Sequence, residues 1–111
     1  MSDWYDRDGN PIGLDQLDSI EKRVAETMLD SCWVSTVWLG LDHAFMGGPP
    51  LIFETMVFPA KDGEVTDYCE LNAKRYSTEA QAREGHDRMV EWARAHVVNG
   101  AVIGDDDEAA S

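Results

Sequence analysis

The feature that most constrains this chain is a ten-residue segment, 32–41, that is apolar on both sides when it is drawn as a β-strand. Successive side chains of a strand alternate between its two faces. One side carries Trp33, Val37 and Leu39, and the other carries Val34 and Trp38. A strand that is apolar on both faces is normally central in its sheet and covered twice. The sequence therefore predicts a sheet built around 32–41, with a separate cover for each face.

Three further segments have the composition of strands: 23–29, 51–58 and 68–76. Asp30-Ser31 is typical of a tight turn, so the first two strands are expected to form a hairpin. Pro59 is expected to end the third strand, because proline cannot donate to a ladder. The last strand is rich in charges, which suits a sheet edge. These segments predict a four-stranded antiparallel meander.

A long amphipathic helix is predicted after Ser77-Thr78, where Thr78 and Gln81 fit a capping box. Its expected buried stripe consists of Ala82, His86, Met89, Val90, Ala93 and Val97. Gly85 lies beside that stripe and would let the helix approach the sheet closely. Asn99-Gly100 is expected to end the helix.

Leucine and isoleucine at positions 14, 17 and 20 indicate a short N-terminal helix, about 14–22. A chain of 111 residues has the size of one domain. We expect a single α+β domain over 1–104, with the long helix on one face of the sheet, and a disordered acidic tail over 105–111. The short helix or a second copy of the chain could cover the other face.

The charge balance is strongly acidic, with 22 Asp and Glu against 9 Lys and Arg, a formal net charge of −13. This argues against direct binding of nucleic acid and against adsorption to anionic membranes. It suits a basic partner or a mimic of a nucleic-acid backbone. No apolar run approaches a membrane span and no secretion signal is visible, so a cytoplasmic location is expected.

The sequence predicts no metal and no cofactor. Cys32 and Cys69 do not form a CxxC pair and are expected to be free thiols. The three histidines, 43, 86 and 96, show no HxH or HExxH spacing. Residues 6–10 imitate the start of a calcium loop, but the glycine and glutamate that such a loop requires are missing.

Candidate functional residues gather near the end of the central strand and the loop after it. Asp42-His43 precedes a Gly/Pro-rich loop. Phe45 and Trp38 are expected to line a shallow pocket beside it. Glu54 interrupts an apolar strand and needs a partner if it is buried, for which His86 and Arg75 are candidates. The complete set is Trp38, Asp42, His43, Phe45, Phe53, Glu54 and His86. No nucleophile elbow is present, which favours binding over catalysis.

Four strings of the sequence resemble a known group of proteins: residues 5–12, 33–43, 49–58 and 75–80. They are similar to small acidic proteins of unknown function from bacteriophage and prophage genomes. The resemblance spans roughly residues 5–95 and carries no activity, cofactor or catalytic residue. It implies a small accessory protein that a phage uses in its host.

Three functions remain as hypotheses. The leading one is a non-enzymatic binding module, self-associating as a homodimer or higher homo-oligomer, that sequesters or inhibits a host protein or a small ligand. The second is an acidic nucleic-acid mimic that blocks DNA-binding proteins. The third is a small hydrolase that uses Asp42, His43, Glu54 or His86.

Overall fold

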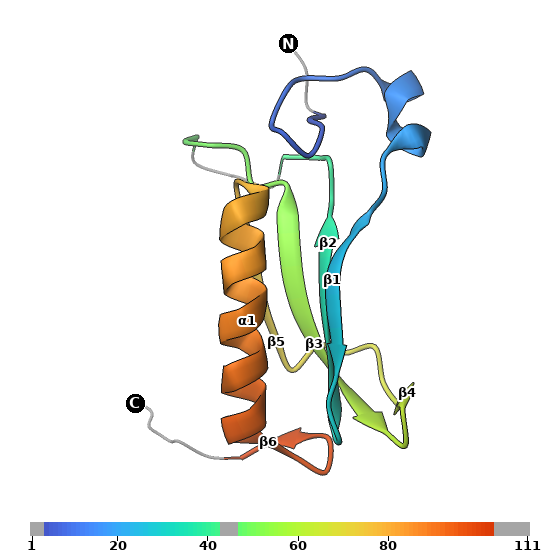
Figure 1. Cartoon of the computed structure of the whole chain (residues 1–111), viewed down its shortest axis with the longest axis vertical. Coiled ribbons are helices and arrows are strands. Elements are labelled where there is room, and N and C mark those ends of the chain that lie inside the picture. Colours follow the sequence, from blue (N-terminus) through green and yellow to red (C-terminus); the bar gives the residue numbers. More distant parts are fainter. Residues whose placement is uncertain (1–3, 43–46, 104–111) are drawn as a thin grey trace.

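The computed structural model describes residues 4–42 and 47–103. It shows an antiparallel sheet with one long helix, α1 (Glu79–His96), along one of its faces (Figure 1). The α+β class predicted from the sequence is confirmed. The predictions for His43, Phe45 and the 105–111 tail lie outside the described residues.

The main sheet has the strand order β1 (Arg23–Met28), β2 (Cys32–Trp38), β3 (Phe53–Lys61) and β5 (Asn72–Tyr76), all antiparallel. A short strand, β4 (Glu64–Val65), pairs with the far end of β3. The predicted meander and the central place of β2 are therefore confirmed. Two predicted strand boundaries are wrong: β3 runs through Pro59 to Lys61, with the Pro59 carbonyl accepting from the Thr66 amide, and the last strand begins at Asn72 and not at Tyr68. Beyond the regular part of β2, the Leu39 amide donates to the Ile52 carbonyl at 2.7 Å, and the Gly40 carbonyl accepts from the Tyr5 amide at 2.9 Å.

Helix α1 begins where the sequence predicts. The Thr78 hydroxyl accepts from the Gln81 amide, and the Gln81 side chain accepts from the Thr78 amide in return. The predicted stripe is buried, together with Gly85. A Cβ at Gly85 would overlap the Tyr76 phenol, so the absent side chain allows the close approach of α1 to β5.

Two predicted helix boundaries are wrong. Helix α1 ends at His96, and Asn99-Gly100 is the turn of a hairpin between β6 (Val97–Val98) and β7 (Ala101–Val102). Asn99 and Gly100 have φ of 52° and 77°, the left-handed values of a type I′ turn, for which Asn-Gly is the preferred pair. The N-terminal helix is a short 3-10 helix, η1 (Leu14–Ser19), not a helix over 14–22.

The core lies between the sheet and α1 and consists of two clusters. One is built around Val34, Val57 and Met89, and the other around Trp38, Phe53 and Tyr76. Side chains of the N-terminal segment, including Leu17 and Ile20, pack against the second cluster. Figure 1 shows this segment, in blue, beyond one end of the sheet, where it does not extend along the face opposite α1.

No helix in the described part of the chain is long and apolar enough to cross a membrane. Cys32 and Cys69 are both free thiols, as predicted.

Candidate functional site: the open face of the sheet

We call the face of the main sheet opposite α1 the open face. Its residues follow from the register, because directly paired residues of an antiparallel sheet point to the same side. Trp33 pairs with Met28 and Phe58, which places these three side chains together. The full set is Arg23, Glu26 and Met28 from β1, Trp33, Ser35 and Val37 from β2, Glu54, Met56 and Phe58 from β3, and Ala73 and Arg75 from β5. No helix of the described residues lies over this face (Figure 1).

Three aromatic rings form a row on the open face, which we call the aromatic row: Trp33, Phe58 and Tyr68. The Trp33 and Phe58 rings stack with centroids 6.0 Å apart, and Tyr68 tilts against Phe58 at 5.5 Å. Phe58, in the middle, is 7 % exposed, whereas Tyr68 is 73 % exposed. Trp33 is half-buried. Tyrosine and tryptophan side chains that are at least partly exposed are enriched at protein interfaces, where they supply contact area with few rotatable bonds.

Charged side chains border the aromatic row. The Trp33 indole Nε1–H donates to the Glu26 carboxylate at 3.1 Å, and the Arg23 guanidinium lies 5.0 Å from the Trp33 ring centroid. Arg23 also reaches Glu26 at 3.5 Å. The open face thus has an apolar centre and a polar border.

Glu54 lies on the open face and not in the core. It forms an ion pair with Arg75, its cross-strand neighbour, at 3.1 Å. Of the two partners that the sequence offers for Glu54, the structure selects Arg75, because His86 lies on the opposite side of the sheet.

A pocket of about 530 Å³ lies at the end of the aromatic row. Trp33 and Tyr68 line it, together with Glu26, Met28, Gly63 and both residues of β4. The pocket therefore combines two aromatic rings with the carboxylates of Glu26 and Glu64.

His86 belongs to a buried chain of hydroxyl groups between the sheet and α1. Its Nε2 lies 2.9 Å from the Thr27 hydroxyl and its Nδ1 lies 2.7 Å from the Thr36 hydroxyl. Thr36 in turn bonds Thr55 at 2.5 Å. Both ring nitrogens of His86 are thus used to hold the helix on the sheet, and the residue is 4 % exposed.

The stability of the domain is expected to fall as the pH drops below about 6.5, where an unperturbed histidine takes up a proton. Burial lowers the pKa of His86, an effect that Asp87 partly opposes. The unfolded chain therefore binds this proton at a higher pH than the folded chain does. The contribution of neutral His86 to the free energy of unfolding is fully present above the pKa of the unfolded chain, and it decreases as the pH falls towards the lower pKa of the folded chain. Urea unfolding at pH 8, 6.5 and 5.5 measures how the free energy of unfolding changes with pH.

We expect His86→Gln to lose most of the pH dependence that the wild type shows in this range. If the free energy of unfolding changed with pH in the same way in the wild type and in His86→Gln, the pH dependence could not be assigned to His86.

The remaining candidate residues do not converge on a site. Trp38 is 3 % exposed, and its indole N–H donates to the Tyr5 carbonyl at 2.9 Å. Phe53 is fully buried in the same core cluster. Neither side chain can touch a partner, which corrects their inclusion among the binding residues. The Asp42 carboxylate accepts the Leu51 amide at 2.9 Å and so closes the loop between β2 and β3.

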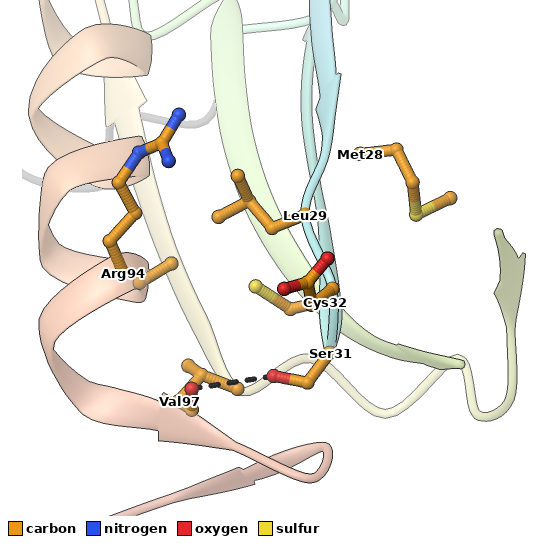
Figure 2. Close-up of a pocket in the computed structure, with 8 residues that line it drawn as sticks. Met28, Leu29, Ser31, Cys32, Arg94 and Val97 are labelled. Atoms are coloured by element: carbon orange, nitrogen blue, oxygen red, sulfur yellow. Dashed lines mark hydrogen bonds between the residues drawn. The ribbon is translucent and has the colours of Figure 1, made fainter. Parts of the chain in front are cut away.

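A second pocket, of about 490 Å³, lies between the β1–β2 turn and the last turn of α1 (Figure 2). The Ser31 hydroxyl donates to the Val97 carbonyl across it at 3.3 Å, and the Cys32 side chain lies on its wall. Burial raises the pKa of the Cys32 thiol. Because the thiolate is the reactive form, this cysteine is a weak nucleophile and a core residue.

Within residues 4–42 and 47–103, no group of three His, Cys, Asp or Glu side chains has the geometry to hold a metal ion. Comparison with protein-family models, with curated proteins and with solved structures finds no significant match to this chain. The open face must therefore be judged by its own chemistry.

Sequence reasoning missed Phe58 and Tyr68 as members of a site. The signal for Phe58 was its place in the third predicted strand, but the long connection between β2 and β3 left its pairing with Trp33 open. Tyr68 carried a weaker signal. It is a lone aromatic residue in the acidic stretch 62–70 and lies outside any strand.

Proposed function

We propose that this chain is a non-enzymatic binding module that holds a protein partner against its open face. The observation that carries the proposal is the aromatic row of Trp33, Phe58 and Tyr68, which no helix of the described residues covers. Aromatic side chains at the centre of a surface, bordered by polar groups, are the residues that most often dominate binding energy at protein interfaces.

The arrangement of the other candidate residues supports binding over hydrolysis. Glu54 and His86 lie on opposite faces of the sheet, and the Asp42 carboxylate is engaged by the backbone of its own loop. A hydrolase built on these residues would need at least two of them to converge on one pocket. Among the described residues, these three side chains do not meet that condition.

The nucleic-acid mimic is a weaker alternative. Such a mimic needs an ordered row of negative charges, but the exposed side of α1 mixes both signs. Glu79 pairs with Arg83 at 2.9 Å, and Glu91 lies 3.6 Å from Arg94. The phage-type origin, the cytoplasmic location and the sequestration or inhibition of a host target stay predictions that this surface neither requires nor opposes.

The proposal is tested by quantitative affinity purification of the tagged chain from its source cells. Tyr68→Ser removes the most exposed ring of the aromatic row. Leu14→Ser is the matched control, because Leu14 is similarly exposed, at 67 %, but lies in η1 beyond the end of the sheet. We expect a partner protein that the wild type and Leu14→Ser recover equally and that Tyr68→Ser recovers at least about tenfold less.

Equal recovery with all three chains, or no specific recovery at all, would refute the proposal. Sedimentation velocity of the purified chain tests whether it self-associates. A dimer that Tyr68→Ser dissociates would show that the open face is occupied by a second copy and not by another protein.

A further inference from the structure

We propose that the pocket between Trp33 and Tyr68 receives a lysine or arginine side chain of the partner. This inference rests on the proposed function and names the chemistry of the partner at that site. Glu26 and Glu64 line the pocket beside the two rings. A cation between aromatic faces and carboxylates gains attraction from both.

The chain itself shows that this surface accepts a guanidinium group. Arg23 lies 5.0 Å from the centroid of the Trp33 ring and 3.5 Å from the Glu26 carboxylate, so an internal arginine already uses the same ring and the same acid. The pocket lies on the Tyr68 side of Trp33, with Glu64 as a further acid. Arg23 is not among the residues that line this pocket.

The surroundings of the pocket favour a basic partner over a neutral or acidic one. The segment 62–70, which contains Glu64 and Tyr68, has four carboxylates and no lysine or arginine. The whole chain carries a formal net charge of −13. A field of this sign attracts a basic protein over a distance and repels a second copy of the chain.

The inference is tested by titrating the ¹⁵N-labelled chain with a penta-arginine peptide and, separately, with a penta-glutamate peptide. The signal to follow is the Trp33 indole N–H, assigned with a Trp33→Phe variant. We expect the arginine peptide to shift this signal saturably, the affinity to fall as salt is raised, and the glutamate peptide to have no effect.

Two variants distinguish a site that is specific for a cation from a surface that is only apolar. Tyr68→Leu keeps apolar bulk but removes the ring, and Glu64→Gln removes one charge with little change of shape. We expect each to weaken the arginine peptide by about fivefold to tenfold, the loss that corresponds to one cation–π or charged contact. Glu84→Gln, on the exposed side of α1, is the control and should leave the affinity unchanged.

Unchanged affinity in Glu64→Gln and Tyr68→Leu, or shifts centred on α1, would overturn the inference. The same variants in the affinity purification distinguish the two proposals. A partner that is lost with Tyr68→Ser but retained in full with Glu64→Gln and with Tyr68→Leu would leave the binding module standing and exclude the cation pocket. If the arginine peptide binds at Trp33 but no partner protein depends on Tyr68, the cation pocket stands and the proposed binding module is excluded.

Discussion

Gly85→Val is expected to destabilise the domain by about 3 kcal/mol, because the new side chain has no room beneath α1. Even the first added carbon would overlap two ring carbons and the hydroxyl oxygen of Tyr76. Tyr76 is buried in the core cluster at this end of the sheet, so its ring has little room to move away. Valine has a better helix propensity than glycine, but this gain is only a few tenths of a kcal/mol and the overlap decides the sign.

Urea unfolding with a fixed m-value measures this effect. Ala95→Val is the control, because it introduces the same side chain at an exposed position of the same helix and should cost less than about 1 kcal/mol. The double variant Tyr76→Val/Gly85→Val should lose at least about 1 kcal/mol less than the sum of the single losses, because removing the ring makes room. Additive losses would show that Tyr76 is not what constrains Gly85.

His86→Ala is expected to destabilise the domain by about 3 kcal/mol, through the cavity that it leaves and the hydroxyl partners that it removes. The hydroxyls of Thr27 and Thr36 both hydrogen-bond the His86 ring, and the Thr36 hydroxyl also hydrogen-bonds that of Thr55. His96→Ala, which removes a half-buried ring stacked on Trp92, should cost about 1 kcal/mol.

The near-isosteric change Thr36→Val tests the hydroxyl chain without opening a cavity. It should cost about 2 kcal/mol, because it leaves one nitrogen of His86 and the Thr55 hydroxyl short of a partner. Equilibrium urea unfolding at pH 8 checks all three variants. A His86→Ala chain as stable as His96→Ala would mean that the buried contacts of His86 do not hold α1 on the sheet.

Much of the fold could be predicted from local patterns. The alternation around Trp33 and Trp38 placed β2 at the centre of the sheet, and the capping box at Thr78 located the start of α1. The Asn99-Gly100 pair was misread because the same dipeptide ends helices and closes hairpins, and only the pairing of Val97–Val98 with Ala101–Val102 decides between them.

The site was harder to predict, because it depends on pairing across strands. Trp38 and Phe53 looked available as aromatic residues near a loop, but the N-terminal segment packs over their end of the core. Glu54 could have faced either side until the register placed it opposite Arg75. Tyr68 reaches the aromatic row from a loop, and no periodic pattern marks such a residue.

The central claim is that the open face is occupied by another protein when the chain is at work in its cell. Replacing Tyr68 with the photoreactive residue benzoyl-phenylalanine and irradiating living source cells tests it directly, with the same replacement at Leu14 as the reference. The account predicts a covalent adduct to a different, basic protein from position 68 and none from position 14. Adducts no stronger at 68 than at 14, or an adduct of twice the mass of the chain, would contradict it.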